Sequence, residues 1–275
     1  MNQDAVKNLL LSIEDAPLDF SLIFSGKKSR KVNGLYKPDG REIIIHNRNF
    51  TGDGGEQNEN ALVYTAIHEY AHHLHACKRG GKLPGRAHTR EFWAIFHTLL
   101  EKAENLNLYS SNIDASPALS ELTTRIKDGF LTENGRLLKE LGRLLVEAQE
   151  LCAGISLRFE DYVDRILCMP RVSAKIAVKM FQYDIRPEIG PDNMRFVAGI
   201  RGEEARGEAE RAFLAGKSPD TVRMSCKSGN TEEDSRTRLV KEKQRIERTI
   251  DALSKRLDEV ERELERELEC ESAGM

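Results

Sequence analysis

The chain has 275 residues, of which 39% are hydrophobic, 32% charged and 6% aromatic, and its formal net charge is −3. This length allows one large domain or two small ones, and the charge balance excludes a globally basic nucleic-acid-binding protein. Five scattered cysteines without a C-x-x-C pair argue against a disulfide framework or a cysteine zinc cluster. Because the sequence shows neither a signal-peptide pattern nor a run of about 18 apolar residues, we expect a cytoplasmic protein without membrane contact.

The first 50 residues predict one amphipathic helix and three short strands. Apolar residues recur at helical spacing within residues 1–17, at Val6, Leu9, Leu10 and Ile13. Strand character follows in three segments separated by turn residues, Phe20–Ser25, Lys31–Lys37 and Glu42–Asn47. We expect these strands to form a small antiparallel meander.

The next segment, Ala61–Lys78, lacks Gly and Pro and is predicted to be a helix. It contains His68, Glu69 and His72 in the pattern His-Glu-x-x-His. Residues four apart lie on the same face of a helix, so both imidazoles can reach one metal ion. Glu69 lies about 100° further round, beside the metal. Two neutral nitrogens and a neighbouring carboxylate are what a hydrolytic zinc site needs.

A third ligand is expected from the second helix, which begins within Ala87–His97. The glycine-containing turn Arg79–Gly85 lets the chain fold back, and we take His88, at the helix start, as the third ligand. Glu91 is the alternative, because it lies one turn further on the same face and other zinc hydrolases use such a glutamate.

The other four histidines are not expected to bind the metal. His97 lies on the opposite side of its helix from His88, and His46 is expected to pack or to face solvent. His73 and His75 lie on the motif helix, where we expect them to support the ligands or to meet solvent.

The string His68-Glu69-Tyr70-Ala71-His72-His73, followed by His88-x-x-Glu91-Phe92-Trp93, resembles the SprT-like zinc metallopeptidases. The resemblance covers roughly residues 18–105 and implies a small zincin-like domain. In that family the corresponding histidines bind zinc and the motif glutamate is the general base, which here implies ligation by His68, His72 and His88 and general-base catalysis by Glu69. The chain lacks the cysteine zinc ribbon that many members carry after this core.

The expected chemistry is peptide hydrolysis in a protein substrate. Zinc lowers the pKa of its bound water towards ~7, and Glu69 would take the water's proton and pass it to the leaving amine. Tyr64 and His75 are candidates for stabilising the oxyanion. An edge strand beside the motif helix can hold an extended peptide, and we assign this role to the third strand, Ile43–His46.

The rest of the chain predicts helices. Residues 106–116 form a linker, and residues 117–225 form a helical domain with a helix-turn-helix outline at Phe159–Leu167 and Val172–Phe181. Its basic residues Arg171, Lys175 and Lys179 could contact DNA phosphates, although two packed helices with a solvated basic edge explain the same pattern.

Residues 231–270 predict a coiled coil. Apolar residues follow heptad spacing at Leu239, Ile246, Ile250, Leu253, Leu257, Val260 and Leu264. We expect homo-oligomerisation through this segment, or its pairing with the helical domain.

The predicted fold class is therefore α+β. A metallopeptidase domain at 1–105 is followed by a helical domain at 117–225 and a coiled coil at 231–270. The alternative function is a DNA-binding or scaffold protein with a structural or inactive zinc site.

Overall fold

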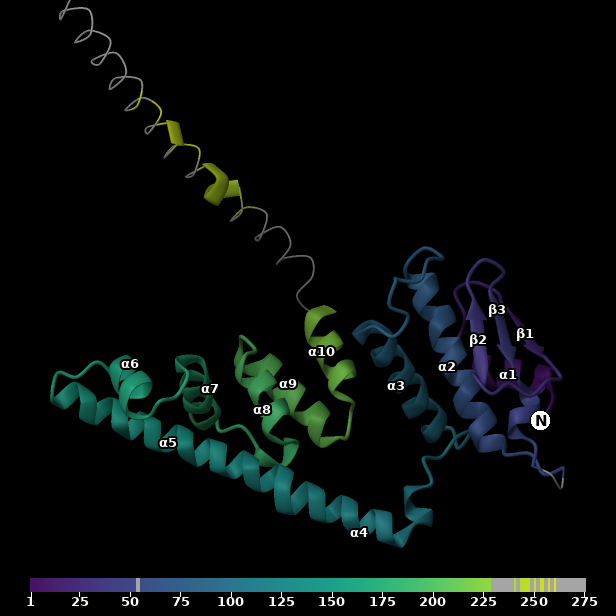
Figure 1. Cartoon of the computed structure of the whole chain (residues 1–275), viewed down its shortest axis with the longest axis horizontal. Coiled ribbons are helices and arrows are strands. Elements are labelled where there is room, and N and C mark those ends of the chain that lie inside the picture. Colours follow the sequence, from purple (N-terminus) through teal and green to yellow (C-terminus); the bar gives the residue numbers. More distant parts are fainter. Residues whose placement is uncertain are drawn as a thin grey trace, which may run out of the picture. The chain divides into compact units, whose positions relative to one another are not determined.

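The structure is a computed structural model (Figure 1) that describes residues 1–52, 55–228, 240, 243–247, 250, 253–254, 257 and 260. Its contacts divide the chain into two compact units, Met1–Ser225 and Cys226–Met275. Within the described residues, no helix has the length and apolar character needed to cross a membrane. The predicted division of the first unit at residues 105–117 remains a prediction.

The predicted coiled coil lies in the second unit. The described residues there are helical, and their apolar side chains at Val240, Ile246, Ile250, Leu253, Leu257 and Val260 are exposed. Leu239 and Leu264, at the two ends of the predicted seam, lie outside the described residues. The coiled coil and the oligomer therefore remain predictions.

The first unit begins with α1 (Gln3–Ile13), followed by the strands β1 (Ser21–Phe24), β2 (Gly34–Lys37) and β3 (Glu42–Ile45). The side chain of Asn2 caps α1 by accepting a hydrogen bond from the Ala5 N–H at 2.8 Å. Side chains alternate across a strand, and Ile43 and Ile45 of β3 accordingly point into the core and are fully buried.

The sheet order is β1-β3-β2, which corrects two sequence predictions. β1 pairs with β3 in parallel and β2 pairs with β3 antiparallel, so the predicted antiparallel meander is wrong for one of the two pairs. β3 lies at the centre, so its assignment as the edge strand is also wrong. The most apolar strand takes the position with a neighbour on each side, because that position buries the most apolar surface.

Two helices complete the core beside this sheet. α2 (Glu59–Lys78) follows the short 3-10 helix η1 (Asn47–Phe50) and packs against β2, β3, α1 and α3 (Arg90–Asn105). The core contains buried residues from all these elements, among them Val6, Leu10, Leu62, Ile67, Tyr70, Phe92, Phe96 and Leu99. Both expected helices are confirmed, although α3 begins after His88 rather than before it.

The rest of the first unit is helical, as predicted. The 3-10 turn η2 (Ile113–Ala115) is followed by one long helical run and then by shorter helices. The long run consists of α4 (Pro117–Ile126), the π-helical η3 (Lys127–Thr132) and α5 (Glu133–Gly154). The shorter elements are α6 (Phe159–Asp161), η4 (Tyr162–Ile166), α7 (Arg171–Gln182), η5 (Pro187–Ile189), α8 (Pro191–Ala198), α9 (Glu203–Leu214) and α10 (Pro219–Ser228).

The helix–break–helix outline is present in α6, η4 and α7. Arg171, the first residue of α7, forms an ion pair with Asp164, so one of the three basic residues expected to meet phosphate is already paired. Lys175 and Lys179 are exposed. DNA contact by this segment remains a prediction.

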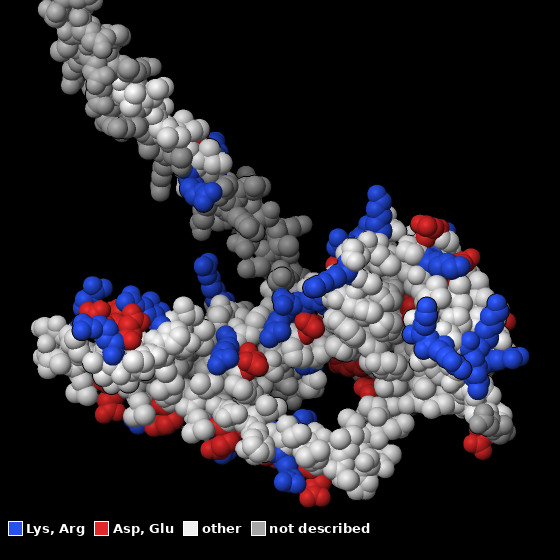
Figure 2. Space-filling view, viewed as in Figure 1, with Lys and Arg blue, Asp and Glu red and all other residues white. Residues whose placement is uncertain are grey.

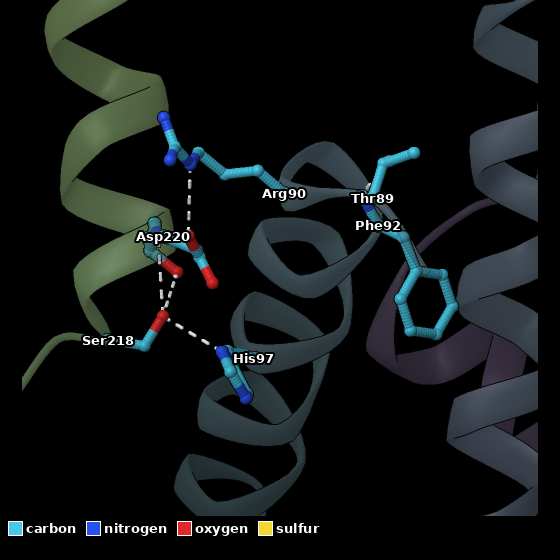
Figure 3. A network of polar contacts seen from close by, with 7 residues as sticks. Thr89, Arg90, Phe92, His97, Ser218 and Asp220 are labelled. Atoms are coloured by element: carbon cyan, nitrogen blue, oxygen red, sulfur yellow. Dashed lines mark hydrogen bonds and ion pairs between the residues drawn. The ribbon is translucent and has the colours of Figure 1, made fainter. Parts of the chain in front are cut away.

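Helix α10 contacts α3 through polar side chains (Figure 3). His97 Nδ1 lies 2.9 Å from Ser218 Oγ, and Arg90 Nε lies 3.4 Å from an Asp220 oxygen. Ser218 Oγ also accepts the Thr221 N–H at 3.2 Å. The Ser218 side chain therefore caps the first turn of α10 and also connects this helix to α3. His97 therefore belongs to a junction between helices, consistent with its exclusion from the metal site.

A glycine determines how closely α5 and α7 approach. A Cβ added at Gly142 would lie 2.0 Å from the Ala177 carbonyl oxygen on α7. Only glycine lets the two backbones approach this closely without displacement. The position of α7 on α5 therefore depends on this residue.

Gly142→Ala is expected to lower the free energy of unfolding by about 1–3 kcal/mol, because the added methyl forces the helices apart. Helix propensity alone would give the opposite sign, since alanine stabilises a helix interior by about 1 kcal/mol relative to glycine. Urea denaturation followed by circular dichroism measures the change. Gly129→Ala, where an added Cβ meets nothing within 4 Å, is the matched control. A Gly142→Ala protein as stable as its parent would contradict the close packing.

Candidate metal centre

Three histidines predicted to bind metal come together in the structure. His68, His72 and His88 each offer one ring nitrogen, and these atoms all lie within 4.8 Å of one another. His68 Nε2 and His88 Nε2 are 3.1 Å apart. Within the described part of the chain this is the one group of three or more His, Cys, Asp or Glu side chains with such geometry. The cluster could bind a metal ion.

The position of His88 is set by the turn before α3. Gly80 and Gly81 have φ angles of 68° and 89°, in the region that favours glycine, and they reverse the chain after α2. Thr89 then caps α3, because its hydroxyl accepts the Phe92 N–H at 3.2 Å. His88 thus lies one residue before the cap, outside the hydrogen bonds of the helix, and its ring reaches His68.

Glu91, the alternative third ligand, lies outside the cluster. Its carboxylate contacts His75 Nε2 at 3.3 Å and Arg79 Nη1 at 3.6 Å. Glu91 is not among the residues whose ligand atoms lie within 4.8 Å of one another. The geometry therefore favours His88 over Glu91.

The ring of Phe92 contacts the imidazole rings of all three clustered histidines. It is fully buried, its ring stacks on His72 with centroids 4.2 Å apart, and it lies 5.0 Å from His68 and 4.8 Å from His88. Phe92 is also a residue of the hydrophobic core. The structure gives it a second role, because a rigid aromatic ring against three imidazoles restricts the orientation of each.

Burial keeps the two helix histidines neutral. Desolvation, with a smaller contribution from His88, lowers the pKa of His68 to about 4. Desolvation and the neighbouring histidines lower the pKa of His72 to about 3. At neutral pH both rings therefore have a free nitrogen lone pair, the form in which histidine binds a metal.

The residues fit a metal ion on two further observations. A tetrahedral zinc ion with Zn–N distances near 2.0–2.1 Å needs ligand nitrogens about 3.3 Å apart, close to the observed His68–His88 separation of 3.1 Å. The buried His72 Nδ1 has no hydrogen-bond partner among the described residues, so no protein group occupies that nitrogen.

Glu69 lies beside the triad and touches β2. A Cβ added at Gly34 would lie 2.9 Å from Glu69 Cγ and 3.1 Å from both Glu69 Oε1 and Thr65 Cγ2. Burial raises the pKa of the Glu69 carboxyl to about 7, partly countered by a hydrogen bond from the Tyr36 backbone. The strand thus confines the carboxyl and also supplies a donor to it.

A cleft of about 420 Å³ opens over these residues. Its walls are residues 32–36 on one side, the α2 residues Tyr64, Thr65, His68, Glu69 and His72 on another, and Leu83, Ala87 and His88. His88 is exposed, so the triad is reachable from solvent. β2 has a partner strand on one side only, and residues of this strand line the cleft.

His73 and His75 are both fully buried and do not meet solvent. His73 Nε2 donates to the Leu18 carbonyl at 2.9 Å, which leaves Nδ1 to accept from the Tyr36 hydroxyl at 3.1 Å. His75 Nε2 contacts the Glu91 carboxylate and lies 3.5 Å from the hydroxyl of Thr89, the residue that follows His88. Neither ring belongs to the metal cluster.

Sequence reasoning missed Gly34 and Tyr36, which come from β2 rather than from the motif helix. The available signal was the glycine itself, because an isolated glycine at the start of a strand often marks a close backbone approach. The identity of the group that approaches could not be read from the strand alone.

Comparison of the chain with models of protein families, with curated proteins and with solved structures found no match. The assignment of a candidate metal site therefore rests on the geometry described above.

His88→Ala is expected to abolish stoichiometric zinc binding, because two ligands on one helix cannot replace three. Glu91→Ala should keep about one zinc per chain, since Glu91 contacts His75 and Arg79 instead. Metal content of the purified, dialysed proteins, measured by mass spectrometry of the elements, compares the two. If Glu91→Ala loses zinc and His88→Ala keeps it, the ligand assignment is wrong.

Proposed function

We propose that this chain is a zinc-dependent peptidase of SprT-like type that hydrolyses peptide bonds in protein substrates. The observation that carries the proposal is one cleft that contains three clustered imidazoles and the carboxyl of Glu69. The fold of the first 105 residues, a small mixed sheet beside a helix with His-Glu-x-x-His, agrees with this proposal.

His68, His72 and His88 would hold the zinc ion. Three protein ligands leave one coordination position open, which is typical of catalytic rather than structural zinc sites. When bound, zinc polarises a carbonyl group and acidifies water. The exposure of His88 leaves a path for a substrate to the same place.

Glu69 would be the general base. A carboxyl with a pKa of about 7 can accept a proton and release it again near neutral pH. In this role Glu69 takes a proton from the attacking water and delivers it to the nitrogen of the departing amine. The Tyr36 backbone donor and the close contact with Gly34 keep the carboxyl directed at the cleft.

The substrate would lie along β2. The edge of this strand that faces away from β3 pairs with no other strand in the described part of the chain, and an extended peptide could add there as a further strand. In this proposal β2, rather than the third strand, holds the extended peptide.

Tyr64 is the better of the two candidates for stabilising the oxyanion. It lies one turn before His68 on α2, lines the cleft and is 41% exposed. His75 is fully buried against Glu91 and does not line the cleft, so it is excluded from this role.

Glu69→Gln should keep zinc at about one per chain and lower kcat/KM for peptide hydrolysis by about 10²–10⁴-fold, the usual contribution of a general base. Cleavage of a fluorogenic peptide pool and the metal content of the same preparation measure both effects. Glu121→Gln, at an exposed position on α4, is the matched control. Full activity in Glu69→Gln would refute the assignment, and equal loss of activity in both variants would point to a contaminant.

Gly34→Ala is expected to lower kcat/KM about 10²-fold with zinc content unchanged, because the added methyl displaces Glu69 or the strand by a few tenths of an ångström or more. The same peptide pool and metal measurement test this, with Gly129→Ala as the control. Unchanged activity would show that Glu69 is not held in place by β2.

A further inference from the structure

The loop between β1 and β2 concentrates positive charge. Lys27, Lys28, Arg30 and Lys31 are all exposed, and none of them forms an ion pair with a residue that the structure describes. Residues 20–50 contain seven basic and two acidic residues, a net charge of +5 in a chain whose total is −3. Figure 2 shows Lys and Arg side chains gathered over the part of the surface where Figure 1 draws the strands.

The loop is held in one conformation by Asn49 of η1. Asn49 Nδ2 donates to the Ser29 carbonyl at 2.8 Å and to Asn33 Oδ1 at 2.9 Å, while Asn49 Oδ1 accepts the Ser29 N–H at 2.9 Å. The Ser29 hydroxyl in turn accepts the Lys31 N–H at 3.3 Å. The backbone that carries these charges is therefore ordered before any ligand arrives, which lowers the entropic cost of binding.

The loop leads directly into the wall of the cleft. Val32 and Asn33 line the cleft, and Gly34 then contacts Glu69. The basic loop precedes the N-terminal end of β2. A peptide lying along β2 would therefore pass the loop at that end of the strand. Unpaired charges beside a cleft raise the local concentration of ligands of opposite sign by about 10–10³-fold.

We propose that the loop 27–31 is a specificity site that selects substrates with an acidic segment on one side of the cleaved bond. This inference rests on the proposed peptidase function and adds a substrate class to it. Aspartate and glutamate side chains of the substrate would pair with Lys28, Arg30 and Lys31.

An acidic peptide fits this surface better than a nucleic acid. The four basic residues span at most roughly 17 Å of chain, and they adjoin a cleft of about 420 Å³ that suits a peptide segment. Proteins that bind duplex DNA electrostatically commonly contact six to ten phosphates over a wider surface. The four positive charges lie close together before β2, so a short acidic segment of a peptide is long enough to pair with them.

The test compares two fluorogenic peptide pools with the same randomised centre, one flanked by Asp-Glu-Asp and the other by Asn-Gln-Asn. We expect the wild-type kcat/KM to be about 10-fold higher for the acidic pool at low salt, and the ratio to fall as ionic strength rises. Lys28→Glu with Lys31→Glu should bring the ratio to 1 or below and leave cleavage of the neutral pool unchanged. Arg125→Glu with Lys127→Glu is the control and should keep the preference, because both residues are exposed at the junction of α4 and η3 and form no ion pair with a described residue.

Binding is measured separately with the Glu69→Gln variant, by fluorescence anisotropy of the two labelled pools and of a 20-base-pair DNA duplex. Equal cleavage of both pools by the wild type would overturn the inference and leave the peptidase intact. Failure to cleave either pool, with loop-dependent binding of the acidic pool retained, would refute the peptidase but not the acidic-peptide site. Loop-dependent binding of the duplex without a preference for the acidic pool would show a nucleic-acid surface and overturn the inference.

Discussion

The structure of the first 105 residues depends on one constraint, which is that α2 is buried on almost every side while four of its buried side chains are histidine or glutamate. His72, His73 and His75 are at most 7% exposed, and Glu69 is 6% exposed. A buried polar group costs free energy unless it finds a partner, so each of these side chains requires something specific from the elements packed against the helix. The neighbours of α2 therefore serve the fold and the site together.

Each neighbour meets this requirement in its own way. β2 supplies the Tyr36 hydroxyl to His73 and a backbone donor to Glu69, while the segment before β1 supplies the Leu18 carbonyl. At the start of α3, the cap residue Thr89 and the first-turn residue Glu91 contact His75. The buried Nδ1 atoms of His72 and His75 are left without a partner among the described residues. The first of these two atoms lies at the triad, where an external ligand would complete the arrangement.

Local patterns predicted the helices and the metal triad, since both depend on spacing within short segments. The period of four between His68 and His72 and the turn before His88 were sufficient to predict the cluster. Strand order was not predictable in this way, because the parallel pairing of β1 with β3 joins segments that are separated in the sequence by β2. The roles of Gly34 and Phe92 were missed for the same reason, since both arise from contacts between distant segments.

The helical region contacts the part of the chain that holds the histidine cluster through α3, the helix that follows His88. The contacts on the two faces of α3 differ in energy. Full burial of Phe92 is worth about 1.5–3 kcal/mol, and its stacking on His72 adds to this. The Arg90–Asp220 pair is about half exposed at its arginine, and such pairs contribute about 0–1 kcal/mol. The core face of α3 therefore fixes the position of His88, and the contacts with α10 add little to it.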